Sequence, residues 1–185
     1  MRMKRLAVIL LAALCALMPL SALAGVYINN PDPADRLHLR SYPSTQAPSL
    51  GKYYNGAPIT ALEDNGKGWV RARVGLAPGS LIGWMQKSFL LNTDKAAPAS
   101  AMPQYRNAGI ITVFQQPSNF SVSEQIEPNQ VFSLMGFSDS WWHLLVTQDS
   151  GTYSCFVRAG AGNLYLVDGD SVPQLAHISN PDNND

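Results

Sequence analysis

The sequence predicts an all-β protein whose two halves are similar to each other. Three observations support this prediction: short stretches of alternating apolar and polar residues, turn signals between them, and apolar positions that recur along the chain. No stretch shows the long 3.6-residue apolar period of an amphipathic helix. Short strands separated by frequent turns are typical of a small β-sandwich or β-barrel.

The alternation is clearest from Val70 to Val74, where Arg71 and Arg73 stand between apolar residues. Successive strand side chains point to opposite faces, so we expect one face of this strand in the core and the other to carry the arginines. Shorter runs of the same kind occur at 37–39 and 59–61. Turn signals such as Asn-Gly and Pro-Gly separate the predicted strands.

The first 24 residues have the three parts of a secretory signal peptide. Three basic residues precede an apolar run at 6–18, and Ala22-Leu23-Ala24 supplies small residues for cleavage. The run is shorter than the roughly 20 residues that span a bilayer. We expect cleavage after Ala24, which leaves 161 of the 185 residues, with 10 basic and 13 acidic side chains and a net charge of −3.

Apolar positions of the two halves recur at an offset that drifts from 74 to 72 residues, with Trp69 matching Trp141 and Val74 matching Val146. Such self-similarity indicates internal repetition. Residues 92–108 contain two prolines and several alanines, and are predicted to be a linker. The predicted organisation is a signal peptide (1–24), a first domain (25–91), the linker (92–108), a second domain (109–167) and a polar tail (168–185).

Several short motifs in the first half, in order, resemble those of the bacterial SH3 (SH3b) family. They are Leu37-His38-Leu39-Arg40 followed by Pro43-Ser44, Leu50-Gly51, Gly56-Ala57-Pro58-Ile59, Gly68-Trp69-Val70-Arg71-Ala72, and Gly83-Trp84-Met85 followed by Phe89-Leu90. The resemblance implies two small SH3-like β-barrels in tandem, each of five to six short strands, joined by the Pro/Ala-rich linker. The second half resembles the family less, because Phe114 stands where the family has Arg and Cys155-Phe156 replaces Gly-Trp.

Catalytic signatures are weak. The mature chain keeps one cysteine, Cys155, in a strand-like run, and the repeat places His143 outward, like Arg71. A cysteine nucleophile needs a paired histidine that lowers the thiol pKa. We therefore predict a small, largely buried thiol and no enzymatic activity. The three histidines and two cysteines of the chain are not closely spaced, so we also predict no metal site, and we expect no cofactor.

Charge is divided unevenly along the sequence. Residues from Arg36 to Leu91 carry seven bases and two acids, or +5, whereas residues from Gly109 to Asp170 carry one base and six acids, or −5. Three explanations remain open. The basic half attracts an anionic polymer, or the two halves complement each other, or the division is an incidental property of a solvated surface.

Aromatic residues are interspersed with the bases of the first half. Rings stack on sugar faces, and arginine contacts carboxylates or phosphates through two parallel hydrogen bonds. Trp84 is expected to close the barrel core. The candidate ligand-binding residues are Arg40, Tyr42, Lys52, Tyr53, Tyr54, Trp69, Arg71 and Arg73.

The expected function is non-catalytic binding at the bacterial cell envelope, as the SH3b resemblance implies. The expected partner is peptidoglycan or an anionic glycopolymer, and the alternative is a structural or regulatory adaptor that binds another secreted protein. The near-zero net charge of the whole chain argues against nucleic acid as a partner. We expect a secreted or periplasmic protein, associated with the envelope and without stable membrane insertion.

Overall fold

The computed structural model describes residues 25–32, 34–93, 102–160 and 163–167. Fourteen antiparallel strands form one connected sheet network, and the helical element of the described part is a 3-10 turn, η1 (Lys87–Phe89). The predicted signal peptide and polar tail lie outside the described residues. Within the ranges given above, no helix has the length and apolar character needed to cross a membrane.

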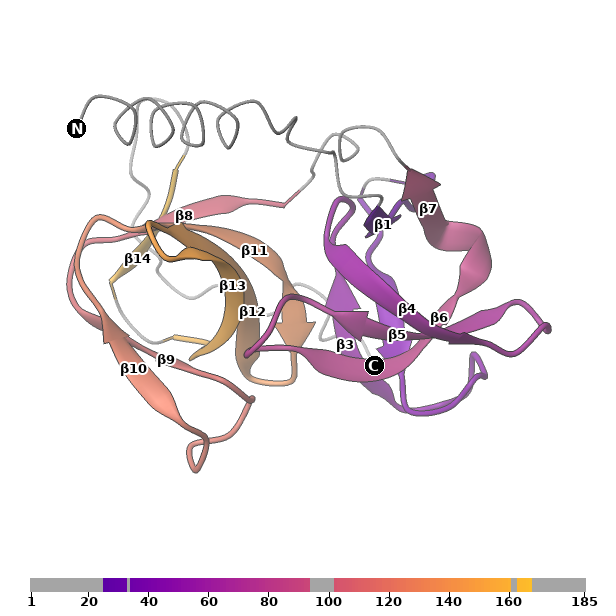
Figure 1. The fold of residues 1–185 in the computed structure, drawn as a ribbon. Coiled ribbons are helices and arrows are strands. Elements are labelled where there is room, and N and C mark those ends of the chain that lie inside the picture. The colour runs from indigo at the N-terminus through magenta and orange to yellow at the C-terminus, as the bar shows by residue number, and fades with distance from the viewer. Residues whose placement is uncertain (1–24, 33, 94–101, 161–162, 168–185) are drawn as a thin grey trace, which may run out of the picture.

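Two groups of seven strands lie side by side (Figure 1). The first group is β1 (Gly25–Ile28), β2 (Leu37–Arg40), β3 (Ser49–Tyr53), β4 (Pro58–Asp64), β5 (Trp69–Val74), β6 (Leu81–Gln86) and β7 (Leu90–Thr93). The second group is β8 (Gln104–Asn107), β9 (Ile111–Phe114), β10 (Ser123–Ile126), β11 (Val131–Ser138), β12 (Trp141–Gln148), β13 (Gly151–Arg158) and β14 (Leu164–Leu166).

The strands pair in the same pattern in both groups. In the first, β2 pairs with β3 and β6, β5 with β4 and β6, and β1 with β4 and β7. In the second, β9 pairs with β10 and β13, β12 with β11 and β13, and β8 with β11 and β14. Each of these strands is numbered seven higher than its counterpart in the first group. The register also repeats, since Arg40 lies opposite Trp84 and Phe114 lies opposite Phe156. Each strand of the first group therefore has a counterpart in the second.

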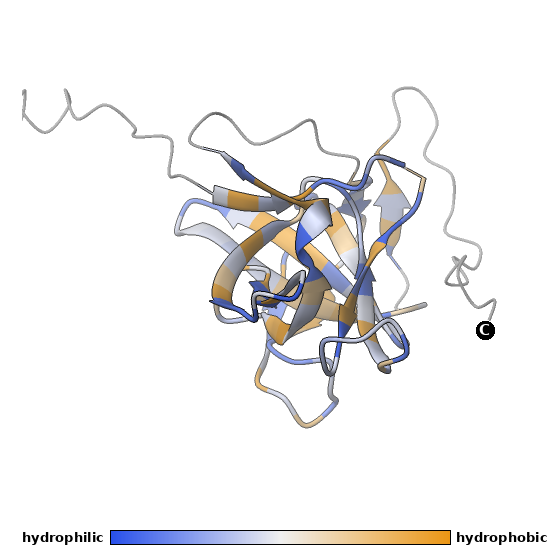
Figure 2. Cartoon of the chain, turned by 90° about the vertical axis from the view of Figure 1, so that its right-hand side faces the viewer, coloured by the Kyte–Doolittle hydropathy of each residue, from blue (hydrophilic) through white to orange (hydrophobic). Residues whose placement is uncertain are grey.

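The core consists of two apolar clusters, one in each group of strands. The first includes Leu39, Tyr53 and Met85, and the second includes Phe132 and Leu144. Hydropathy colouring shows apolar stretches along the strands and polar residues concentrated in loops (Figure 2). The clusters are not fully separate along the chain. Met135 of β11 packs in the first cluster, and Tyr54 packs against the second.

The two groups are joined by strand pairing. Gly136 and Phe137 of β11 pair with Tyr53 and Lys52 of β3, so the sheet continues from one half into the other. A Cβ on Gly136 would overlap the β3 backbone, and only glycine permits this close approach. The halves therefore share a backbone ladder as well as apolar contacts.

The predicted boundaries of the linker are wrong at both ends. Asn92 and Thr93 belong to β7, and β8 (Gln104–Asn107) pairs with β11 and β14. The alternation in β8 buries Tyr105 and Asn107 while Arg106 is exposed. This strand has only four residues and one large apolar side chain, so it lacks a hydrophobic pattern. The second half thus begins before residue 109.

Candidate ligand-binding surface

Three of the predicted site residues share one face of β5. Trp69 is partly exposed and Arg71 and Arg73 are exposed, while Val70, Ala72 and Val74 point into the core. This is the alternation that the sequence predicts. Neither arginine side chain contributes to the apolar core.

The same face continues across β6 and β2. Arg71 lies opposite Trp84 of β6, and Trp84 lies opposite Arg40 of β2. Directly opposed residues project to the same side of a sheet. The result is a cross-strand row with an indole between two guanidinium groups, which we call the Arg–Trp–Arg row (Arg71, Trp84 and Arg40).

Trp84 was expected in the core, but it is partly exposed and faces outward. Gly83 and Met85 are the buried residues of this part of β6, so the alternation puts Trp84 on the opposite face. Arg40 is held in place because its Nη1 donates a hydrogen bond of 2.7 Å to the carbonyl oxygen of Ala47. Sequence reasoning missed Trp84 as a surface residue, although the period of two marks it.

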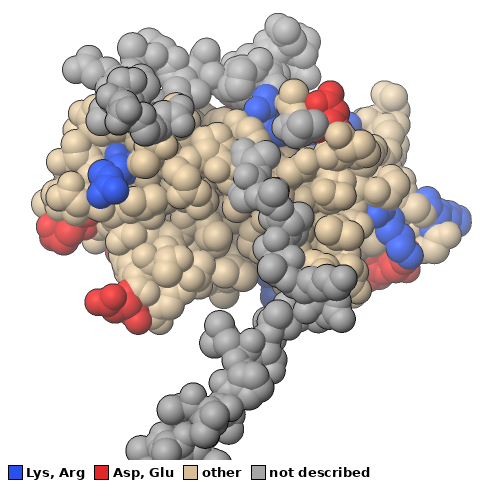
Figure 3. Space-filling view, turned by 90° about the horizontal axis from the view of Figure 1, so that it is seen from above, with Lys and Arg blue, Asp and Glu red and all other residues tan. Residues whose placement is uncertain are grey.

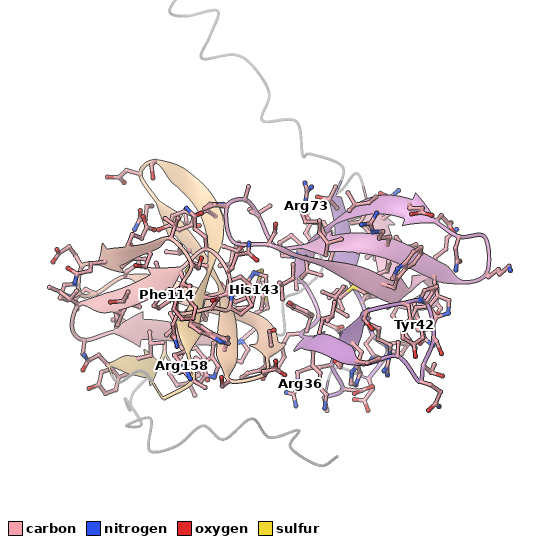
Figure 4. All side chains as sticks on the ribbon, turned by 90° about the horizontal axis from the view of Figure 1, so that it is seen from below. Arg36, Tyr42, Arg73, Phe114, His143 and Arg158 are labelled. Atoms are coloured by element: carbon pink, nitrogen blue, oxygen red, sulfur yellow. The ribbon has the colours of Figure 1, made fainter. Side chains whose placement is uncertain are left out.

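The other predicted site residues are spread over different parts of the first half. Tyr42 is 50% exposed in the loop after β2, and it lies far from Arg73 in Figure 4. Lys52 is partly buried on β3, opposite His38 of β2 and Phe137 of β11. Neither residue lies directly opposite a member of the Arg–Trp–Arg row on a neighbouring strand.

Two of the predicted binding residues, Tyr53 and Tyr54, do not lie on an open surface. Tyr53 is fully buried, because it follows buried Gly51 in the alternation of β3 and packs between the halves. The prediction that it is an exposed ligand contact is wrong. Tyr54 is partly buried, its hydroxyl accepts a hydrogen bond of 3.0 Å from Arg36 Nη1, and the Arg36 guanidinium carbon lies 4.9 Å from its ring centre.

His143 was predicted to point outward, and it is fully buried at the boundary between the halves (Figure 4). Its Nε2 lies 2.8 Å from the carbonyl oxygen of Gly79, so Nε2 carries the proton and donates. Its Nδ1 then accepts from the Tyr53 hydroxyl at 3.1 Å. The ring also stacks on Phe156, with the centroids 4.1 Å apart. Burial lowers the pKa of His143 to about 4, against the opposing effect of the Gly79 hydrogen bond.

The boundary is also bridged by the loop between β5 and β6. The backbone N–H of Leu76 donates to Ser154 Oγ at 2.9 Å, and the backbone N–H of Ser154 donates to the carbonyl oxygen of Leu76 at 3.2 Å. Gly75 has φ +83°, and a Cβ there would lie 2.5 Å from Ser154 Oγ. These cross-boundary hydrogen bonds join neutral groups and give no support to charge complementarity between the halves.

Cys155 and His143 do not form a catalytic pair. Cys155 lies opposite Leu144, one position along β12 from His143, and it packs in the apolar cluster of the second half. Burial, with a smaller effect from Glu124, raises the pKa of the Cys155 thiol to about 12. The thiol is therefore protonated at neutral pH, and the thiolate is the nucleophilic form.

The charge division is smaller than the sequence count indicates. Described residues 25–93 carry seven bases and four acids, or +3. Residues 102–170 carry two bases and six acids, or −4, because Arg106 belongs to the second half. Both signs occur over each half on the face shown in Figure 3. Arg40, Arg71 and Arg73 share the outward face of β2 and β5, and Glu63 of β4 lies opposite Arg71 at the edge of this face.

The described residues contain no group of three or more His, Cys, Asp or Glu side chains placed to hold a metal ion. The arrangement that remains is an exposed sheet face with arginine and tryptophan side chains in register. Chemically, such a face offers hydrogen-bond donors for anionic groups and flat surfaces for sugar rings.

Comparison with known proteins gives one family match, which covers part of the chain. The model of the bacterial SH3 domain family (SH3_3) matches residues 35–90. Among solved structures, the chain is similar to NlpC2 from Trichomonas vaginalis, with 13% identity and a TM-score of 0.33. The similarity covers 76% of this chain and 47% of the NlpC2 chain, so this chain spans less than half of the length of NlpC2. No curated protein matches. Residues 35–90 of this chain are thus a bacterial SH3 domain.

Proposed function

We propose that this chain is a non-catalytic binding protein that recognises a polymer of the cell envelope, either peptidoglycan or an anionic glycopolymer. The observation that carries the proposal is the Arg–Trp–Arg row, extended along β5 by Trp69 and Arg73. Sugar rings stack on the indoles, and carboxylates or phosphates accept hydrogen bonds from the guanidinium groups. The bacterial SH3 domain contains all five of these residues.

The second half is proposed to be a divergent SH3-like barrel. Support comes from its strand pairing, which repeats that of the first half strand by strand. The predicted export signal at residues 1–24 supports a location outside the cytoplasm, where such a polymer is accessible.

The test is retention of the mature chain (residues 25–185) on purified sacculi. Arg71→Glu combined with Arg73→Glu should reduce the retained fraction at least tenfold. Retention of the unaltered chain should also weaken as salt rises, because exposed charges are screened over about 10 Å at 0.1 M salt. Trp69→Ala should weaken retention and leave the salt dependence in place.

The matched control is Lys67→Glu combined with Arg106→Glu, which makes the same change of net charge at exposed positions outside the row, in the turn before β5 and on β8. The control should bind like the unaltered chain. Equal losses for the two double variants would show that net charge alone is responsible, and would contradict a site at the row. Failure of the unaltered chain to bind sacculi, with capture of a single secreted protein, would favour the adaptor function instead.

A further inference from the structure

A pocket of about 320 Å³ lies in the second half, away from the Arg–Trp–Arg row. Its walls come from the β9–β10 hairpin and the β12–β13 hairpin, and Pro78 of the first half adds to the lining. The volume is at the lower end of the range for small-molecule sites. The loop that carries Pro78 is fixed by the Ser154 and His143 hydrogen bonds described above, so the pocket depends on both halves.

The polar side of this pocket carries one carboxylate and no Lys or Arg side chain among its lining residues. Glu124 Oε1 accepts a hydrogen bond of 2.7 Å from the Tyr153 hydroxyl. This bond orients the carboxylate and leaves Glu124 Oε2 and the lone pairs of the tyrosine oxygen as acceptors. Gln115, Gln148 and Ser123 supply further polar atoms to the lining. These acceptors therefore favour a ligand that is positively charged and rich in hydrogen-bond donors.

The repeat explains why a cation is missing here. The position of Phe114 on β9 corresponds to Arg40 on β2, since the two residues occupy the same register. The Arg40 guanidinium donates to a carbonyl oxygen of its own hairpin loop. Phe114 lines the pocket and supplies an apolar wall without a charge. At this register position the second half therefore lacks the cation that the first half carries, and Glu124 lies in the same pocket lining as Phe114.

The rim of the pocket is apolar and ordered. Val122, which lines the pocket, is 67% exposed, and Phe120, two residues earlier, is fully exposed. Backbone and serine hydrogen bonds hold this hairpin tip, and Arg158 Nη1 contacts Asn119 Oδ1 at 3.3 Å. Arg158 and Phe114 lie on the same side of the second half in Figure 4. A preorganised apolar rim next to an acidic pocket fits a ligand whose charged end is attached to an aliphatic chain.

We infer that this pocket binds a primary alkylammonium group, such as that of a lysine side chain, with the charge at Glu124 and Tyr153 and the aliphatic part against Phe114 and Val122. An ammonium group has three donors, which match the carboxylate, phenol and amide oxygens of the lining. The carboxylate is solvent-exposed, so the attraction is screened and the affinity for a single side chain should be weak.

The experiment titrates the mature chain with Nα-acetyl-lysine N-methylamide and follows the backbone amide resonances of the pocket residues by NMR. The norleucine analogue has the same chain without the amine and should bind at least tenfold more weakly. Butylamine distinguishes the two sources of the ammonium group: binding equal to that of the lysine derivative indicates a free amine, and weaker binding indicates a peptide side chain.

Glu124→Gln preserves the shape of the side chain and the acceptor for Tyr153, and should weaken binding of the lysine derivative at least tenfold. Glu127→Gln removes an exposed acid outside the pocket and is the matched control, with no change expected. Equal binding of the lysine and norleucine derivatives, or an unchanged affinity in Glu124→Gln, would overturn the inference. Because Arg71 and Arg73 lie elsewhere, their variants should leave this titration unchanged, whatever they do to sacculus binding.

Discussion

The buried imidazole of His143 makes the stability of the folded chain depend on pH. The ring is enclosed by Phe156, the Tyr53 hydroxyl and the β5–β6 loop, and its two nitrogens bond to Tyr53 and Gly79. A proton on Nδ1 would remove the acceptor for the Tyr53 hydroxyl and place a charge in an apolar boundary. Burial raises the pKa of Tyr53, so this neighbour also stays neutral. Acidification therefore acts on the junction between the halves.

The magnitude follows from two pKa values. An unfolded histidine has a pKa of about 6.5, and burial lowers that of His143 to about 4 in the folded chain. Between these values the unfolded chain binds a proton that the folded chain does not, so the free energy of unfolding falls as pH falls. Above pH 7 the ring is neutral in both states and has no effect. A fall from pH 7 to pH 5 should remove about 2 kcal/mol, approaching about 3 kcal/mol near pH 4.

The assay is urea unfolding of the mature chain at pH 7, 6 and 5, followed by tryptophan fluorescence. His143→Gln keeps a neutral donor and acceptor at this position and is the comparison. The variant should be less stable at pH 7, because it loses the stacking on Phe156. The free energy of unfolding of the variant should nevertheless change less with pH than that of the unaltered chain. The two slopes should differ by up to about 1.4 kcal/mol per pH unit. Equal pH dependence in the two proteins would refute the reasoning, and an imidazole pKa near 6.5 by NMR would do so independently.

Three further predictions concern the boundary and the buried thiol. Cys155 should react with a thiol reagent far more slowly in the folded chain than in urea, because burial raises its pKa to about 12; equal rates would contradict this. Gly79→Ala should cost about 1 to 3 kcal/mol, because the added Cβ overlaps the backbone of Ser154, and an unchanged urea midpoint would count against the close approach. Protease cleavage between residues 94 and 101 should leave two fragments that elute together on gel filtration, since β3 pairs with β11; separate elution would show that the halves are independent.

Much of the first half could be predicted from the sequence, because its strands face the core on one side and solvent on the other. The alternation from Val70 to Val74 is the clearest case, and the structure reproduces it residue by residue. The tryptophans matched in the sequence, Trp69 and Trp141, begin β5 and β12, which take corresponding places in the pairing pattern. By contrast, β8 gave no signal, because four residues with one large apolar side chain do not establish a period.

The candidate site was predicted in part. Arg71 and Arg73 were placed correctly on the outer face, but Tyr53 and His143 were not, because both lie where one half covers the other. Strand β12 is buried on both faces for this reason, so alternation cannot indicate which of its residues meet solvent. Which surface of one half is covered by the other half depends on the tertiary arrangement, so the local alternation of residues does not indicate it.

The pairing of β3 with β11 has a consequence for self-assembly. The two paired strands are not counterparts of each other, since β3 corresponds to β10 and β11 corresponds to β4. A contact between two unlike surfaces can be repeated from one copy of the chain to the next and form an open filament. The free counterparts would be β10 at one end of the sheet and the part of the β4 edge that lies beyond its pairing with β1. The bulge that precedes Gly136 in β11 recurs in β4, but Glu63 stands in the place of that glycine. A side chain there obstructs the close backbone approach, and adjacent Asp64 adds charge to the edge. The chain thus carries one such joint internally, and Glu63 and Asp64 disfavour its repetition at the edge of β4.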